Sequence, residues 1–142
     1  MDLVKKADTD NPVYYVQYAH ARICSIFRKA EEEGIGVPDR VMSLFEYLDL
    51  PEELAMMRMM AGFPSLLQEI AQSLEPHRLT YYLTDLAAAF HRYFNLGTKV
   101  PDHRILTDDL DLTRARLFLA RGIRTVIANG LKLLGVSAPD RM

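Results

Sequence analysis

The sequence TRARLFLARGIRTVIANGLKLL, residues 113–134, decides the fold class of this chain. It contains no proline, and its apolar residues recur at the spacing of three and four that gives a helix one apolar face. We expect Asp111 or Thr113 to cap the start of this helix and Gly135 to end it. A helix of roughly 33 Å with one broad apolar face needs other helices to cover that face. Two adjacent rows make up the face: Ala120, Ile123, Ile127 and Leu134, and beside them Leu119, Val126 and Leu133.

Two further long segments have the same helical periodicity. Asn11 and Pro12 are typical of a helix cap and a first helical position, and the helix should run to about Glu33. A second helix is expected from His77 to Asn95. Each has a predicted buried row: Val16, Ala19, Ile23, Ile26 and Ala30 in the first, and Leu79, Leu83, Leu86, Phe90 and Tyr93 in the second.

Shorter helices are expected over residues 39–48, 51–61 and 65–74, the last opened by a capping box of Ser65 and Gln68. Together the segments predict an all-α antiparallel bundle of about five or six helices. Residues 12–33, 76–95 and 112–134 should form its frame, with the shorter helices packed on it.

Composition predicts one domain, residues 1–142, that lies in the cytoplasm. The chain has 142 residues of which 49% are hydrophobic, enough for a core. No apolar run approaches the ~20 residues of a membrane helix, and the start does not resemble a signal peptide. The single cysteine, Cys24, lies in an apolar helical pattern and is expected to be a buried, inert thiol.

Charge is distributed unevenly along the chain. The net charge is +3 over residues 12–30, −9 over residues 31–111 and +5 over residues 112–142. If the two basic segments lie side by side, they form a positive face on an acidic body. The alternative is a set of solvated arginines on helix surfaces, which long helices often carry.

The sequence offers no catalytic, cofactor or metal site that we expect to function. His20 has no partner at metal-ligand spacing and is expected to pack or to form a hydrogen bond. Met56, Met57, Met59 and Met60 cannot all face one point on a helix, so we expect them to fill the core.

One face of the first helix has a composition that suits RNA. It carries Tyr14, Tyr18, Arg22, Ser25 and Lys29, three and four residues apart and away from the buried row. Aromatic rings stack on exposed bases, and cations pair with phosphates. The alternative is a tyrosine-rich seam between helices. The aromatics of the run HRYFN, residues 91–95, likewise either close the core or line a shallow pocket.

These residues also occur in motifs that resemble a known family. The sequence NPVYYVQYAHAR, residues 11–22, closely resembles the helix that opens the C-terminal anticodon-binding domain of arginyl-tRNA synthetases. The resemblance continues through PHRL (76–79), ARL (115–117) and NGL (129–131) to APDRM (138–142), so it covers nearly the whole chain in order.

The resemblance implies a domain of a larger enzyme. Full synthetases of this family attach arginine to tRNA with ATP and Mg²⁺ in a catalytic domain that precedes this one. The His-x-Gly-His and Lys-Met-Ser-Lys signatures of that domain do not occur here. We therefore expect an excised C-terminal fragment, a monomer without catalytic residues or a cofactor of its own. Its partners would be the anticodon loop of arginine tRNA and the catalytic domain of the same chain.

Carried over by position, the resemblance implies an anticodon-binding set of Tyr18, Arg22, Phe94 and Met142. Relatives often have tyrosine where this chain has Phe94, which preserves stacking and removes a hydroxyl. The terminal methionine would bring an apolar wall and the chain's carboxylate to the base. A different class of function remains open: a helical protein–protein interaction module that does not bind RNA. The dependence of binding affinity on salt concentration distinguishes the two functions, because RNA binding weakens steeply as the salt concentration rises.

Overall fold

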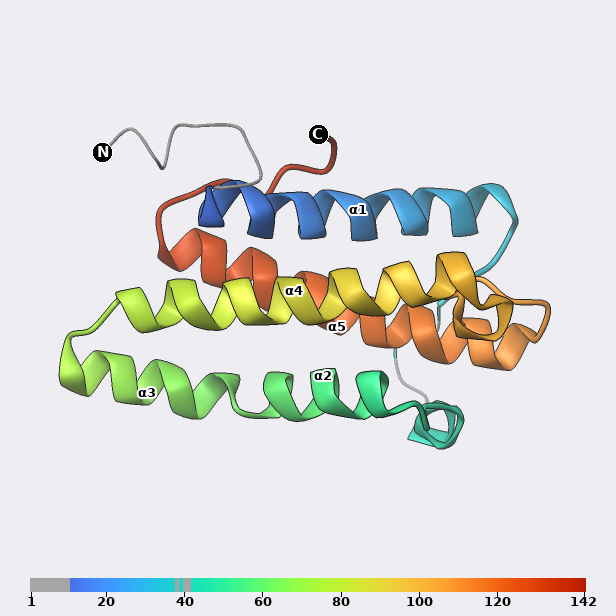
Figure 1. Cartoon of the computed structure of the whole chain (residues 1–142), viewed down its shortest axis with the longest axis horizontal. Helices are drawn as coiled ribbons and strands as arrows, with labels where there is room; N and C mark the ends of the chain where they lie inside the picture. Colours follow the sequence, from blue (N-terminus) through green and yellow to red (C-terminus); the bar gives the residue numbers. More distant parts are fainter. Residues whose placement is uncertain (1–10, 38, 40–41) are drawn as a thin grey trace.

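The computed structural model describes residues 11–37, 39 and 42–142, and within them every regular element is helical, as predicted (Figure 1). The single-domain boundary 1–142 remains a prediction. The described chain has five α-helices and two short 3₁₀ helices: α1 (Pro12–Glu32), η2 (Met42–Tyr47), α2 (Pro51–Ala61), α3 (Phe63–Ser73), α4 (His77–Lys99), η3 (Pro101–His103) and α5 (Leu110–Leu133).

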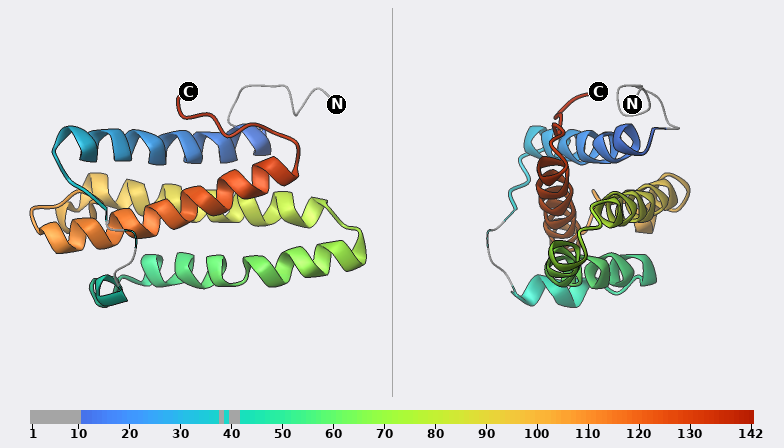
Figure 2. Two further views of the ribbon diagram at one scale, coloured as in Figure 1. Left: turned by 180° about the vertical axis from the view of Figure 1, so that it is seen from behind. Right: turned by 90° about the vertical axis from the view of Figure 1, so that its left-hand side faces the viewer.

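The three long helices form the frame of an antiparallel bundle. Helix α5 runs opposite to α1 and α4 and contacts both, and α1 also packs on α4 (Figure 1). Helices α2 and α3 follow one another along the side of α4 that lies away from α1 (Figure 2). None of the described helices combines the length and apolar character that crossing a membrane requires.

Helix α1 forms as the sequence predicts. The Asn11 side chain accepts hydrogen bonds from the backbone N–H groups of Val13 (3.0 Å) and Tyr14 (3.5 Å), which caps the helix start. Gly34 follows the end of the helix with a φ of +73°, a left-handed conformation that suits glycine. The predicted rows of α1 and α4 are buried in full, and together with α5 they form the centre of the core.

Helix α5 is capped by Asp109, so the prediction of Asp111 or Thr113 was wrong. The Asp109 carboxylate accepts from the backbone N–H groups of Asp111 and Leu112. The buried Thr113 hydroxyl instead donates to the carbonyl of Thr107 and accepts from its N–H group, so it fastens the preceding loop. Gly135 follows the helix in the predicted left-handed conformation.

The second predicted row of α5 leaves the core at its end. Leu119 is buried, but Leu133 is 61% exposed. Residues repeated every seven positions drift ~20° per repeat around a straight helix, so Leu133 has turned away from the partners of Leu119.

Three further boundaries differ from the prediction. The described part of residues 39–48 contains the 3₁₀ helix η2 rather than an α-helix. Helix α3 begins at Phe63, two residues before the predicted cap, so Ser65 lies inside the helix. The helix can include Pro64 because proline is tolerated in the first turn. Helix α4 continues past Gly97 to Lys99. There Gly97 makes room for the chain that follows, since a Cβ atom would lie 3.0 Å from the backbone of Arg104.

The methionines of α2 fill space in the core as predicted. Met56 is fully buried, and Met57, Met59 and Met60 pack partly buried against the core cluster. Thioether side chains adapt to irregular gaps of this kind.

Candidate functional site

Helices α1 and α4 and the segment after α5 surround a cavity of about 350 Å³. All four residues predicted for the site line it. Tyr18 and Arg22 come from α1, one helical turn apart, Phe94 comes from α4, and Met142 comes from the C-terminal segment. The complete lining is Tyr18, Ala21, Arg22, Ser25, Ile26, Arg28, Phe94, Arg141 and Met142. Tyr18 is 38% exposed and Met142 51%, so both are accessible to a ligand.

The Arg22 guanidinium lies over two aromatic rings of the cavity. Its Cζ atom is 4.4 Å from the ring centroid of Phe94 and 4.9 Å from that of Tyr18. Its Nη2 donates to the Tyr18 hydroxyl at 3.0 Å. Arg22 is thus held by its neighbours, whereas the sequence predicted only a cation that pairs with phosphate. A flat ligand must therefore stack on the guanidinium plane or displace it from the rings.

His91 on α4 forms a hydrogen bond with this arginine, a contact that the sequence did not predict. Nη1 of Arg22 lies 3.3 Å from Nδ1 of His91, which must accept because a guanidinium only donates. Burial lowers the pKa of His91, and the adjacent Arg22 cation lowers it further. The imidazole is therefore kept neutral and able to accept. The Tyr18 ring is stacked on it, with centroids 5.6 Å apart.

Hydrogen bonds to α1 hold the segment that carries Met142. Gln17 Nε2 donates to the Ser137 carbonyl at 2.8 Å, and Arg28 Nη1 donates to the Asp140 carbonyl at 3.1 Å. Between them, Nδ1 of His20 donates to the carbonyl of Pro139 at 2.9 Å. His20 thus forms a hydrogen bond, as predicted.

The prediction that His20 has no partner at metal-ligand spacing was wrong. Cys24 Sγ lies 3.8 Å from His20 Nδ1 and 3.7 Å from Asp140 Oδ1, so three ligand types meet. However, Nδ1 carries a proton for its bond to Pro139, and burial raises the pKa of the Cys24 thiol. A metal would have to displace both protons.

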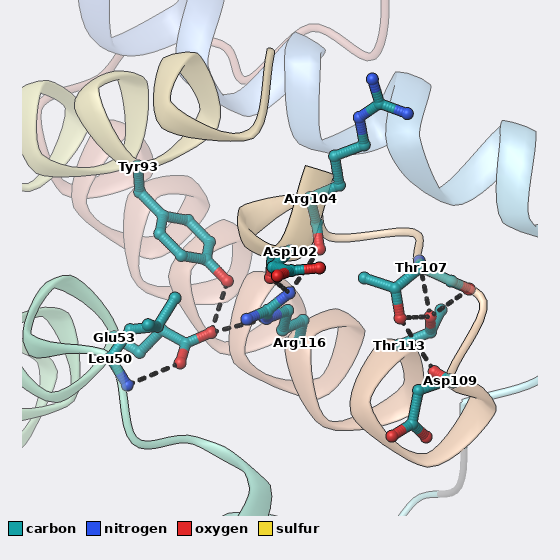
Figure 3. Close-up of polar contacts among 9 residues, drawn as sticks. All are labelled: Leu50, Glu53, Tyr93, Asp102, Arg104, Thr107, Asp109, Thr113 and Arg116. Carbon is teal, nitrogen blue, oxygen red and sulfur yellow. Dashed lines mark hydrogen bonds and ion pairs between the residues drawn. The ribbon is translucent and has the colours of Figure 1, made fainter. Parts of the chain in front are cut away.

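The positive face predicted from the sequence lacks one of its members, because Arg116 is buried. It is 3% exposed, and its Nε donates to the Glu53 carboxylate at 2.8 Å (Figure 3). Glu53 is fully buried and also accepts from the Tyr93 hydroxyl at 2.6 Å. Arg116 Nη1 donates to the carbonyls of Asp102 and Arg104, both at 2.7 Å, and so fixes η3.

Two other arginines of α5, Arg121 and Arg124, are only partly buried. The Arg124 guanidinium lies 4.4 Å from the Phe27 ring centroid on α1, and that of Arg121 lies 5.0 Å from the Phe118 centroid. Arg28 of α1 and Arg121 and Arg124 of α5 line one further surface cavity, so basic side chains of the two helices lie close together there.

The chain is similar to known proteins over its whole length. The pattern of the DALR anticodon binding domain family matches residues 16–142. An arginine–tRNA ligase of Syntrophotalea carbinolica is 50% identical over 142 residues, which are 100% of this chain and 24% of that protein. One of Geobacter metallireducens is 46% identical with the same shares.

A solved structure shares the fold. The match to Thermus thermophilus arginyl-tRNA synthetase has a TM-score of 0.77 and 38% identity, and covers 96% of this chain and 22% of that chain. The chain thus spans about a quarter of the length of the relatives it matches.

Proposed function

Since the chain belongs to the DALR anticodon-binding domain family, we propose that it binds the anticodon loop of arginine tRNA as one domain of an arginine–tRNA ligase. The observation that carries the proposal is the cavity in which Tyr18, Arg22, Phe94 and Met142 meet. It combines flat aromatic surfaces with cations at an accessible place, which is the chemistry that single-stranded RNA requires.

In this proposal an unstacked anticodon base enters the cavity. The base stacks on the Arg22 guanidinium or replaces it on the rings of Tyr18 and Phe94. Such stacking contributes on the order of 1–3 kcal/mol per base. Met142 provides an apolar wall, and the two other arginines of the lining, Arg28 and Arg141, attract the phosphate backbone.

Attachment of arginine would take place elsewhere in the complete enzyme. We propose that another domain performs this reaction with ATP and Mg²⁺, because the relatives are named arginine–tRNA ligases and this chain spans only about a quarter of their length. This chain alone should then give no arginine-dependent exchange of pyrophosphate into ATP. Measurable exchange by the purified chain would contradict this division of labour.

The binding proposal can be tested with a short RNA hairpin that carries the arginine anticodon loop. Tyr18→Ala and Phe94→Ala should each weaken binding by roughly 5- to 150-fold, which corresponds to the loss of one stacking contact. Tyr81→Ala is a matched control, because Tyr81 is 66% exposed on α4 and does not line the cavity. Binding is measured by fluorescence anisotropy, beside a thermal melt of each variant.

The same titrations separate RNA binding from the protein-interaction alternative. Affinity for the hairpin should fall steeply between low and physiological salt. If the two cavity variants melt normally and bind the hairpin like the wild type, the site assignment is wrong.

A further inference from the structure

Three side chains that can ligate a metal meet where the C-terminal segment lies on α1. His20 and Cys24 are four positions apart on α1, so they share one face of the helix, with Cβ atoms about 5–6 Å apart. The segment after α5 turns back over α1 and brings Asp140 beside Cys24 (Figure 1). One imidazole nitrogen, the thiol sulfur and one carboxylate oxygen all lie within 4.8 Å of one another.

The spacing of these atoms fits a tetrahedral zinc ion. Its bonds are about 2.3 Å long to sulfur and about 2.0–2.1 Å to nitrogen or oxygen, so sulfur lies about 3.5–3.6 Å from each other ligand atom. Here Cys24 Sγ is 3.8 Å from His20 Nδ1 and 3.7 Å from Asp140 Oδ1. Shifts of roughly 0.3 Å would bring both pairs to coordination distance. The Asp140 side chain is exposed and can rotate to complete the geometry.

The burial of the three residues gives the route by which an ion would enter. His20 is 5% and Cys24 7% exposed, so the helix side of the site is closed. Cys24 and Asp140 both line a surface cavity of about 570 Å³, which supplies an opening on the other side. A water molecule in this cavity can serve as the fourth ligand, since zinc accepts three protein ligands and one water.

The charges around the cavity determine which metals can bind. It is lined by four arginines, Arg28, Arg121, Arg124 and Arg141, which repel a cation that binds through charge alone. Mg²⁺ and Ca²⁺ also require several oxygen ligands, whereas thiolate and imidazole suit zinc. Burial raises the pKa of the Cys24 thiol, but the Arg124 guanidinium beside it lowers that pKa in part. Arg124 thus favours the thiolate that a metal of the zinc class binds.

We propose that His20, Cys24 and Asp140 form a binding site for one thiol-binding divalent cation of the zinc class. The ligand atoms are His20 Nδ1, Cys24 Sγ and Asp140 Oδ1. On binding, the thiol proton passes to solvent, and the proton of the neutral imidazole moves from Nδ1 to Nε2. The inference goes beyond the proposed RNA binding, because none of the three ligands lines the base-binding cavity.

Metal binding exchanges one link between α1 and the C-terminal segment for another. The Pro139 carbonyl loses its 2.9 Å hydrogen bond from His20 Nδ1, because that nitrogen now faces the ion. In return, the ion joins two residues of α1 to Asp140. An ion that binds only the folded chain stabilises it by mass action.

Cobalt(II) is a suitable probe, because it occupies zinc sites and its absorption reports thiolate coordination. Titration of the reduced, metal-free chain should give a thiolate-to-cobalt band that saturates at one ion per chain. Zn²⁺ should abolish the band, because zinc binds such sites more tightly than cobalt does. A large excess of Mg²⁺ should leave it unchanged.

Variants of each ligand test the set of three. Cys24→Ser should remove the band. Asp140→Asn and His20→Gln should each weaken cobalt binding by about 100-fold or more, since even loss of an outer-shell partner typically weakens it by about 10- to 100-fold. Glu31→Gln is the matched control for Asp140, because it removes the same charge from the lining of the same cavity. It should leave the affinity nearly unchanged, as should His77→Gln at an exposed histidine.

Thermal melts provide a second readout. Zn²⁺ should raise the melting temperature of the wild type and of Glu31→Gln, but not that of Asp140→Asn. Because the Asp140 side chain is exposed, Asp140→Asn decides the question even if Cys24→Ser does not fold.

Three results would overturn the proposal. The folded wild type might bind neither Co²⁺ nor Zn²⁺ at one equivalent. Asp140→Asn and His20→Gln might bind cobalt like the wild type, which would mean that Cys24 holds the ion alone. Glu31→Gln might weaken binding as much as Asp140→Asn does, which would show an effect of charge and not of ligation.

Discussion

Replacement of Glu53 by glutamine should lower the free energy of unfolding by about 3–5 kcal/mol, the usual result of removing one charge from a buried ion pair. The Glu53 carboxylate accepts three hydrogen bonds with its two oxygens: from Arg116 Nε at 2.8 Å, Tyr93 Oη at 2.6 Å and the backbone N–H of Leu50 at 3.1 Å. An amide has only one oxygen. In either orientation, its NH₂ group must face a donor, and Arg116 becomes a buried cation without a counter-charge.

The effect on the melting temperature follows from the size of the chain. Unfolding entropy is about 2.1 cal/mol/K per residue, or about 0.3 kcal/mol/K for a chain of this length. A loss of 3–5 kcal/mol should therefore lower the midpoint by about 10–17 °C. Calorimetry or a circular-dichroism melt in the same buffer measures it.

Two variants with smaller expected effects serve as comparisons. Tyr93→Phe removes one hydrogen bond to the carboxylate but keeps the ion pair, and should lower stability by about 1.5–3 kcal/mol. Arg78→Gln removes the exposed pair with Glu69, whose atoms lie 2.7 Å apart, and should change stability by less than about 1 kcal/mol. If Glu53→Gln destabilises the chain no more than Arg78→Gln does, a buried Arg116 without its counter-charge costs no more than a broken surface pair, and the expected effect is refuted.

Three further substitutions test other parts of the structure. Gly130→Ala should destabilise the chain by about 1–3 kcal/mol in a urea titration, because a Cβ atom would lie 2.6 Å from Leu83 Cδ2; a gain in stability would show that this contact relaxes freely. The lowered pKa of His91 adds stability above the unfolded value of about 6.5, and this stability is lost as the pH falls through the folded pKa. Melts between pH 7 and 5 should therefore show a smaller acid-induced decrease for His91→Gln, and equal decreases would refute the role of His91. Asn11→Ala should lower stability by about 1 kcal/mol through loss of the cap on α1, whereas an unchanged melt would mean that water replaces it fully.

The long helices were predictable because their signal is local. A row such as Val16, Ala19 and Ile23 repeats within one segment, and a cap such as Asn11 lies beside the residues whose N–H groups it accepts from. Boundaries that depend on a distant contact were not predictable. Helix α4 passes through Gly97 because the backbone of Arg104 packs on it, and nothing near Gly97 in the sequence indicates that contact.

The buried ion pair escaped the sequence analysis for the same reason. Glu53 and Arg116 are separated by 63 positions, and each alone resembles a surface charge. A signal was nevertheless present. Arg116 lies four residues before Ala120, on the buried row of α5, and a charge on a core row indicates a buried partner.

Only part of the candidate site could be predicted from the residues themselves. The helical spacing of Tyr18 and Arg22 placed them on one face of α1, whereas the positions of Phe94 and Met142 came from a family resemblance. Their meeting around one cavity depends on the path of the C-terminal segment, and periodicity carries no information on that path. The contact of Arg22 with His91 depends on the packing of α1 on α4 and was missed as well.

The hydrogen bonds that fasten the C-terminal segment to α1 have a consequence for how its sequence can vary. Side chains of α1 donate these bonds, and backbone carbonyls of Ser137, Pro139 and Asp140 accept them. Most side chains could replace those three without loss of an acceptor. A single inserted or deleted residue, by contrast, would displace Met142 by up to about 3.6 Å and take its thioether away from the cavity. Among related chains, the number of residues between Gly135 and this methionine should therefore vary less than their identity.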